Sequence, residues 1–211
     1  MSENYPPARG GWQKHPANPV LGGPATGTCF DVQVRYADGI YTMYFSWRPR
    51  RSLAAVTSGD GIHWSEPEII LGPRPESGWE DDVNRGYVVQ QGAIRHLWYA
   101  GQARGYSRIG YAVSRDGGPF ERVGDLPVMI PELPWEKESV YNPCVLFDPA
   151  RKIFRMWYAG GETYEPNSLG YAESADGVVW RKSPLNPIFI HGDQPCDRDR
   201  VGACDIIPTG D

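Results

Sequence analysis

The sequence predicts an all-β protein built from repeated four-stranded units. Helix signals are scarce, because 25 glycines and 20 prolines are spread through the 211 residues and few stretches keep a helical apolar period. Short segments rich in aromatic and β-branched residues recur instead, each bounded by turn residues. The repeat length and the number of strands in each unit are those of a β-propeller, in which four-stranded blades surround a central channel.

Each expected strand is short and lies next to a turn. The second strand of each group carries an aromatic pair or run, written "MYFSW", "LWYAG" or "MWYAG". The third strand leads to an Asp-Gly pair, beginning at Asp60, Asp116 or Asp176, which supplies the positive φ angles of a tight hairpin. We therefore assign these pairs to hairpins and not to an active site. In chain order, the expected strands cover residues 31–36, 40–47, 52–57, 87–92, 96–101, 108–114, 144–147, 154–160 and 169–174.

The repeats divide a single predicted domain, residues 1–211, into units and one displaced piece. The segment "WQKHPANPVL" at 12–21 matches "WRKSPLNPIF" at 180–189, so it is expected to form the outer closing strand of the last blade. The chain stops about one strand into its fourth unit, which predicts a fragment of a propeller or a propeller that a second chain completes. The expected repeat units cover residues 26–71, 79–130, 135–190 and 196–211.

A leading segment opens each unit and supplies its innermost strand. The segments are "TGTCFDVQV", "WEDDVNRGYVV", "WEKESVYNPCVLF" and "CDRDRVGACDII". Aligning them places Asp31, Arg85, Asn142 and Ala203 at equivalent positions. In a propeller these positions look into one end of the central funnel, which makes them the candidate functional site.

The chain resembles the five-bladed β-propeller glycosidases related to glycoside hydrolase families 43, 32, 68 and 130. The resemblance covers residues 12–207 and rests on the repeated "MWYAG...LGYAESADGVVW...NPIF" pattern, on "FDVQV" and on "YNPCVLF". It implies an Asp that begins the innermost strand of the first blade, a second Asp in a later blade, and a Glu that acts as general acid. Such carboxylates suit glycoside cleavage, because one protonates the leaving oxygen while another activates water or attacks carbon.

Carried over to this chain, the resemblance makes Asp31 the first carboxylate, which is the base in inverting families and the nucleophile in retaining ones. Asn142 stands where the second Asp is expected, and Gly202 and Ala203 stand where the Glu is expected. The acid is therefore sought among the neighbouring carboxylates, or the chain binds a sugar without cleaving it. The predicted catalytic set is Asp31, Glu138, Asp199 and Asp205.

A further set of residues is predicted to bind the sugar. Arg85 offers a bidentate contact to an acidic sugar or a phosphate, and it equally fits a structural ion pair with Asp31. Trp79 and Trp135 are expected to stack on sugar rings at the mouth of the funnel. Asp82 fits either the funnel or a capped turn. The predicted substrate-binding set is Asp82, Arg85, Asn142, Trp79 and Trp135.

Composition excludes several other classes of function. A net charge of −5 and a pI near 5.4 argue against binding to nucleic acid. No apolar run approaches the length that spans a membrane, and the first residues lack the profile of a signal peptide, so a soluble, cytoplasmic protein is expected. The four cysteines form no CxxC pair and match no metal template, so no metal and no cofactor are predicted.

The leading functional hypothesis is a glycosidase-like hydrolase that acts on a small oligosaccharide or glycoside through carboxylates in the central funnel. One alternative is a glycoside phosphorylase of the family 130 type, in which Arg85, Arg198 or Arg200 would converge near Asp31 to bind phosphate. Another alternative is a carbohydrate-binding propeller without catalysis, which the amide of Asn142 and the apolar Ala203 favour. The partner expected in every case is a small carbohydrate.

Overall fold

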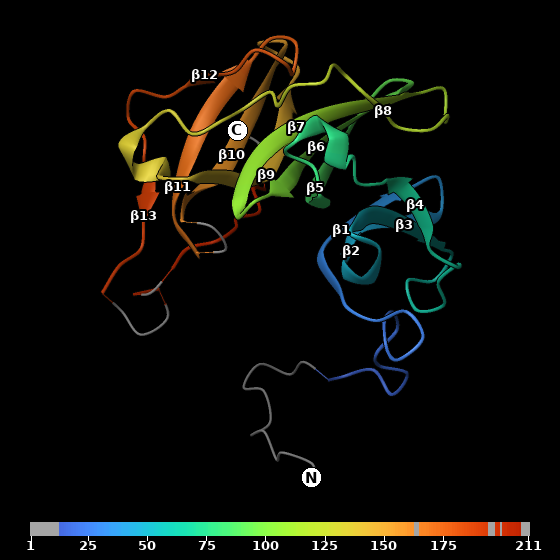
Figure 1. Cartoon of the computed structure of the whole chain (residues 1–211). Helices are drawn as coiled ribbons and strands as arrows, with labels where there is room; N and C mark the ends of the chain where they lie inside the picture. The colour runs from blue at the N-terminus through green and yellow to red at the C-terminus, as the bar shows by residue number, and fades with distance from the viewer. Residues whose placement is uncertain (1–12, 163–164, 194–196, 199, 208–211) are drawn as a thin grey trace.

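The computed structural model describes residues 13–162, 165–193, 197–198 and 200–207, which form three antiparallel sheets (Figure 1). The first sheet has the order β1 (Cys29–Ala37), β2 (Ile40–Trp47), β3 (Ser52–Ser58) and β4 (Glu68–Leu71). The second has the order β5 (Asp82–Gln91), β6 (Ile94–Ala103), β7 (Tyr106–Arg115) and β8 (Glu121–Arg122). The third contains β9 (Ser139–Asp148), β10 (Ile153–Glu162), β11 (Glu165–Ser174) and β12 (Arg181–Lys182), and β13 (Phe189–Ile190) pairs with β11.

The all-β prediction and the four-stranded units are therefore confirmed. The helices of the described residues are short 3-10 turns: η1 (Arg48–Arg50), η2 (Pro75–Ser77) and η3 (Pro134–Glu136). Within those residues, no helix has the length and apolar character needed to cross a membrane. The turns lie in the connections between strands, so the sheets alone carry the core.

The innermost strands of the second and third sheets begin earlier than the sequence predicted. The expected starts were residues 87 and 144, whereas β5 begins at Asp82 and β9 at Ser139. In β5 the pairing with β6 shifts register between Asn84 and Tyr87, and β1 shifts in the same way between Phe30 and Gln33. A bulge interrupts the alternation of inward and outward side chains, so the leading segments do not read as strands in the sequence.

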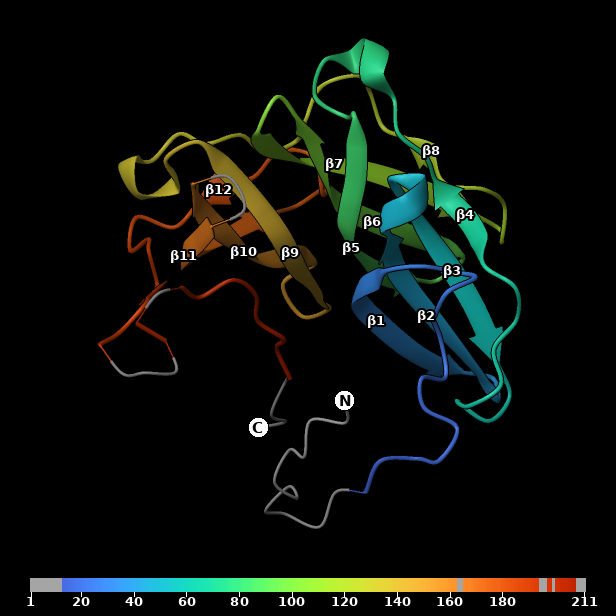
Figure 2. The same ribbon diagram turned by 60° about the horizontal axis from the view of Figure 1, so that its bottom comes forward.

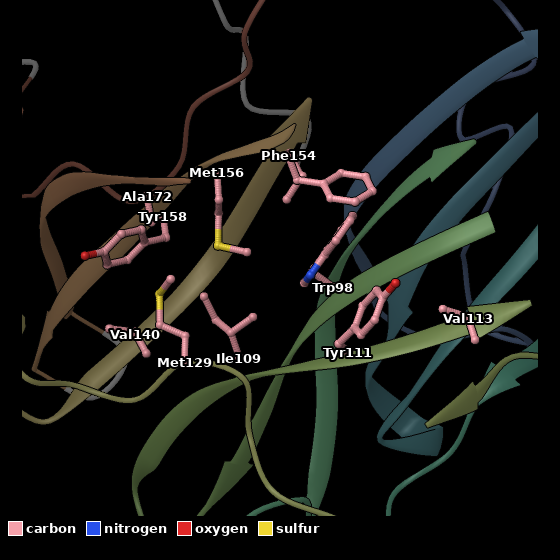
Figure 3. Packing of buried hydrophobic residues seen from close by; sticks show 11 residues of the cluster. Trp98, Ile109, Tyr111, Val113, Met129, Val140, Phe154, Met156, Tyr158 and Ala172 are labelled. Atoms are coloured by element: carbon pink, nitrogen blue, oxygen red, sulfur yellow. The ribbon is translucent and has the colours of Figure 1, made fainter. Parts of the chain in front are cut away.

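The second and third sheets pack face to face through a common core (Figure 3). The ring centroids of Trp98 on β6 and Phe154 on β10 lie 5.0 Å apart, and the two rings meet edge to face. The indole Nε1 of Trp98 donates a 2.9 Å hydrogen bond to the carbonyl of Gly177, beyond the end of β11. Met129, in the connection between the two sheets, fills the same cluster. These contacts join the second sheet to the third.

Two of the three Asp-Gly turns differ from the tight turns that the sequence predicted, whereas Asp116 and Gly117 form one, with φ of 51° and 76° and a 2.8 Å hydrogen bond from the N–H of Gly118 to the carbonyl of Arg115. Asp60 lies in a long connection between β3 and β4, and its Oδ1 accepts hydrogen bonds from the backbone N–H groups of Ile62 and His63, each at 2.8 Å. Asp176 does the same after β11 with the N–H groups of Val178 and Val179, each at 2.9 Å. The aspartate side chain, and not a two-residue turn, therefore organises these connections.

The two Trp-Glu pairs of the leading segments are structural. Glu80 is fully buried, and its carboxylate accepts hydrogen bonds from Tyr99 Oη at 2.8 Å, Arg122 Nε at 2.8 Å and Arg74 Nε at 3.1 Å. Trp79 covers β6 and β7 beside it, stacked on Tyr99 with the ring centroids 6.1 Å apart. The group ties the leading segment of the second sheet to the outer strand β8, because Arg122 belongs to that strand.

The third sheet repeats this arrangement with different residues. Glu136 is fully buried and accepts hydrogen bonds from Tyr158 Oη at 2.6 Å and Lys182 Nζ at 2.8 Å. Trp135 lies over the backbone of Gly170, where an added Cβ would sit 2.7 Å from the indole ring. The two tryptophans are thus packed against their own sheets, which corrects the prediction that they stack on sugars.

The ends of the described chain carry no assigned strand. Residues 13–22 form turns, and residues 200–207 run beside β9 (Figure 2). Val201 and Cys204 of that segment pack against a small cluster that includes Tyr141 of β9. The predicted outer closing strand at 12–21, the repeat boundaries and the completion of a ring by a second chain stay predictions.

The stability of the third sheet is expected to depend on pH through Glu173. Hydrogen bonds from Arg151 and Tyr171 lower the pKa of Glu173 from 4.5 to about 2. A lowered pKa stabilises the folded state above pH 4.5, and this stabilisation is lost as the pH falls towards 2. Because the two arginines that pair with Glu173 are more than half exposed, Glu173→Gln should cost only about 1 kcal/mol at pH 7. Urea unfolding at pH 7 and pH 2 checks this.

In that experiment the exposed Glu66→Gln serves as the control. The difference between wild type and Glu173→Gln should shrink as the pH is lowered, while Glu66→Gln stays close to wild type throughout. A difference of the same size at both pH values would mean that the carboxylate charge is not what stabilises the sheet.

Candidate functional site

Three residues that the repeats align meet at one cavity. Asp31, Arg85 and Asn142 lie on the innermost strands β1, β5 and β9, and each has a left-handed backbone, with φ of 50°, 52° and 52°. A positive φ at a strand bulge turns a side chain out of the regular alternation. The three side chains line a cavity of about 370 Å³, and Figure 2 shows the three strands on the inner side of their sheets.

Asp31 and Arg85 face each other across this cavity. Arg85 Nε lies 3.4 Å from Asp31 Oδ2. Burial raises the pKa of Asp31, and the positive charges of Arg85 and then Arg48 oppose that rise. The carboxylate is therefore held between burial, which favours its protonated form, and two guanidinium groups, which favour its ionised form.

The backbone and side chain of Arg85 are both fixed by neighbours. Its N–H donates a 2.8 Å hydrogen bond to Ser46 Oγ of the first sheet, and its Nη1 donates a 3.0 Å bond to Asn84 Oδ1. The guanidinium carbon lies 5.5 Å from the ring centroid of Tyr141 on the third sheet. Residues of all three sheets thus hold Arg85 in the cavity.

Asn142 and Asp205 occupy the other side of the cavity. Asn142 Nδ2 donates a hydrogen bond to the carbonyl of Gly202, while its buried Oδ1 has no hydrogen-bond partner within the described part of the chain. Asp205 Oδ1 accepts hydrogen bonds from Tyr87 Oη at 3.4 Å and from the N–H of Ile206 at 3.1 Å. The segment 200–207 therefore brings a second carboxylate to the cavity that Asp31 lines.

A second cavity of about 290 Å³ adjoins the first, because Arg85 lines both. Asp82 lies here, and its Oδ1 accepts a 2.9 Å hydrogen bond from Asn84 Nδ2. Arginines from two hairpin connections, Arg51 and Arg104, line the same cavity. The described carboxylates at the paired cavities are Asp31, Asp205, Asp81 and Asp82.

The remaining predicted residues lie elsewhere. Glu138 is an exposed turn residue that lines neither cavity, and its carbonyl accepts a 2.7 Å hydrogen bond from Arg108. Asp199 lies outside the described residues. Trp79 and Trp135 pack on their own sheets, as described above. Within the described residues, no group of three or more His, Cys, Asp or Glu side chains is arranged to hold a metal ion.

The sequence analysis missed several residues of the cavities. Gln33 lines the first cavity, and its side chain exchanges hydrogen bonds with the N–H and carbonyl of Val88, at 2.7 and 3.1 Å, which ties β1 to β5. Tyr87 lies two positions after Arg85, as Gln33 lies two positions after Asp31. The alignment that placed Asp31 and Arg85 at equivalent positions therefore also pointed to Gln33 and Tyr87. Arg48 and Arg104 lie in loops that carry no such signal.

No known family model matches the sequence. A protein of Mycobacterium tuberculosis described only as uncharacterised is 31% identical over 186 residues, which cover 78% of this chain and 59% of the relative. The β-1,2-mannobiose phosphorylase of a Thermoanaerobacter species is 36% identical over 89 residues, which cover 35% of this chain and 29% of the relative. The chain thus spans less than two thirds of the length of either relative.

Solved structures with similar folds come from carbohydrate-active proteins. An N-acetylgalactosamine deacetylase of Flavonifractor plautii matches with a TM-score of 0.66 and 16% identity, over 89% of this chain and 61% of that protein. A family 117 glycoside hydrolase of Zobellia galactanivorans matches with a TM-score of 0.63 and 17% identity, over 87% and 61%. A structure described for the family 130 mannoside phosphorylases and glycoside hydrolases matches with a TM-score of 0.60. The chain thus shares its fold with these carbohydrate-active proteins.

Proposed function

We propose that the paired cavities form the site of an enzyme that hydrolyses glycosidic bonds in a small oligosaccharide or glycoside. The observation that carries the proposal is the convergence of Asp31, Arg85 and Asn142 on one cavity from three different sheets. The stability of an individual sheet does not require a charged or polar side chain at these positions. Nor does it require a left-handed backbone that turns the side chain towards the shared cavity. The carbohydrate-active proteins that share this fold support a carbohydrate as the ligand.

In the proposed reaction, Asp31 acts in its ionised form. The neighbouring guanidinium of Arg85 stabilises that form, and a carboxylate here can take a proton from water as the water oxygen bonds to the anomeric carbon. The bond from that carbon to the leaving oxygen breaks, and a second carboxyl group gives the leaving oxygen its proton. Asp205 in the first cavity and Asp82 in the second are the described candidates for this acid.

Phosphorolysis is a second candidate, favoured by the positive charge beside Asp31. Arg48 and Arg85 both act on the pKa of Asp31, and both line the second cavity. Phosphate would then replace water as the group that bonds to the anomeric carbon. Arg198 and Arg200, which the sequence also suggested for this role, line neither cavity. The mannobiose phosphorylase relative makes β-1,2-linked mannobiose a suitable first substrate to test.

A panel of aryl glycosides and β-1,2-mannobiose, offered with and without inorganic phosphate, tests the proposal. Release of free sugar that does not depend on phosphate is the expected result, whereas a sugar phosphate formed only with phosphate would support phosphorolysis. Sugar binding measured by calorimetry without any turnover would contradict both reactions and support a carbohydrate-binding protein. Neither binding nor turnover of any sugar would contradict the assignment of the cavities to carbohydrate.

A further inference from the structure

The second cavity has a lining that is more positive than the first. Four arginines line it, Arg48, Arg51, Arg85 and Arg104, and the acidic residues of its lining are Asp81 and Asp82. The excess of positive charge is local, because the chain as a whole carries a net charge of −5. A cavity lined by one sign of charge concentrates ligands of the opposite sign.

Three of these arginines form no ion pair within the described chain, although the charge of Arg48 acts on Asp31 and opposes the rise in the pKa of that carboxyl. Arg85 pairs with Asp31, at 3.4 Å. Throughout the described chain, no carboxylate lies within ion-pair distance of Arg48, Arg51 or Arg104. Arg48 instead lies over the ring of Phe30, 4.6 Å from its centroid, which orients the guanidinium without cancelling its charge. The groups that would bind an anion are therefore available.

The backbone around the cavity is held in place before any ligand binds. The carbonyl of Arg51 accepts a 3.0 Å hydrogen bond from the N–H of Val83, which ties the η1 turn of the first sheet to β5. Gln102, which also lines the cavity, is held by two hydrogen bonds: Asn84 Nδ2 donates to its Oε1 at 2.8 Å, and its Nε2 donates to Ser107 Oγ at 2.9 Å. A site that is already ordered loses less entropy on binding than one that must be organised.

We propose that this cavity binds an oxyanion carried by the substrate, so that the substrate is an acidic saccharide with a carboxylate or sulfate group. Guanidinium groups bind such oxyanions through paired hydrogen bonds. Arg85 borders both cavities, so the anionic group would lie next to the sugar unit that faces Asp31. This inference rests on the proposed function for the identity of the saccharide, but the binding of the oxyanion is measured independently of any turnover.

Titrations that need no catalysis test the inference. The chain is titrated with glucuronate, galacturonate and glucose 6-sulfate, with the neutral parents glucose and galactose, and with inorganic phosphate and sulfate. At least one acidic sugar is expected to bind more tightly than its neutral parent. In the double variant Arg51→Ala/Arg104→Ala, that binding should weaken about tenfold or more, because hydrogen bonds to charged groups are among the stronger ones.

The matched control is Arg115→Ala/Lys152→Ala, which removes the same charge from residues that line neither cavity. Lys152 has a left-handed backbone with a φ of 54°, like Arg104, so the control matches the local strain at one of the two substituted positions. Circular dichroism establishes that both double variants are folded. The control should keep the affinity of wild type for the acidic sugar.

The outcomes separate this inference from the proposed function. Acidic sugars that bind no better than neutral ones, or that bind equally to the Arg51→Ala/Arg104→Ala variant, would overturn the inference even if glycosides are cleaved. Inorganic phosphate that binds while the acidic sugars do not would overturn it in favour of a free anion. A preference for acidic sugars without turnover of any glycoside would support the inference and contradict the proposed function.

Discussion

Replacing Asp31 by asparagine is expected to lower kcat/KM for the best glycoside by about 100- to 10,000-fold, the range associated with losing a general acid or base. Asparagine keeps the shape of the side chain and tolerates the left-handed backbone of this position, but it cannot take up a proton. Sugar binding should therefore persist while turnover falls. Steady-state kinetics and calorimetry on the same preparations measure the two effects separately.

Asp38→Asn is the matched control for this substitution. Asp38 lies just beyond the other end of β1, is exposed, has a φ of 52° and lines neither cavity. The control should keep nearly the whole activity of wild type. An Asp31→Asn variant whose kcat/KM stays within twofold of wild type would remove Asp31 from the reaction.

Replacing Glu80 by alanine is expected to lower the free energy of unfolding by about 3 kcal/mol. The substitution leaves Arg74 and Arg122 without their buried carboxylate and removes the acceptor of the Tyr99 hydroxyl. Breaking a buried ion pair by removing one partner commonly costs about 3–5 kcal/mol. The lower end of that range applies, since the two arginine side chains keep 21% and 19% of their surface exposed.

A loss of this size is a large share of the stability of a typical domain, about 5–15 kcal/mol. Urea unfolding followed by tryptophan fluorescence measures it. Glu76→Ala, at an exposed position in the nearby η2 turn, should change the stability by less than about 0.5 kcal/mol. If Glu80→Ala lowered the stability by less than about 1 kcal/mol, the buried carboxylate would not be holding the second sheet together.

The strands could be predicted because their pattern is local. The segments of β2, β6 and β10 are rich in aromatic and other apolar residues, and the repeats placed the same pattern in each unit. The start of β5 was predicted too late because a register shift between Asn84 and Tyr87 interrupts the strand, and β9 also begins earlier than predicted. Asp31 and Arg85 lie within the register shifts of β1 and β5, and they share with Asn142 a left-handed backbone and a place in the lining of the cavity.

The sequence carries a signal for the structural role of the pairs Trp79-Glu80 and Trp135-Glu136, which the prediction of sugar stacking overlooked. The dipeptide occurs at the start of the second and third units, where the middle strand carries a tyrosine opposite a glycine: Tyr99 opposite Gly110, and Tyr158 opposite Gly170. The first unit has Phe45 at this position, and a phenylalanine has no hydroxyl that could donate a hydrogen bond to a buried carboxylate. The joint occurrence of Trp-Glu with tyrosine is a signal of packing.

The second cavity could not be predicted, because its arginines come from connections with no common pattern. Arg48 and Arg51 flank a turn of the first sheet, and Arg104 lies in a hairpin of the second. Their approach depends on how the first two sheets pack, which the Arg51 to Val83 backbone hydrogen bond fixes. Contacts of this kind arise from tertiary structure, and a local pattern does not reveal them.

A crystal structure of the Asp31→Asn variant soaked with an uncleaved glycoside tests the central claim most directly. The account predicts a sugar ring in the first cavity, within hydrogen-bond distance of position 31, of Arg85 and of the unpaired Oδ1 of Asn142. A sugar that binds only on the outer strands at a saturating glycoside concentration, with no sugar in either cavity, would contradict the assignment of the cavities as the sugar site.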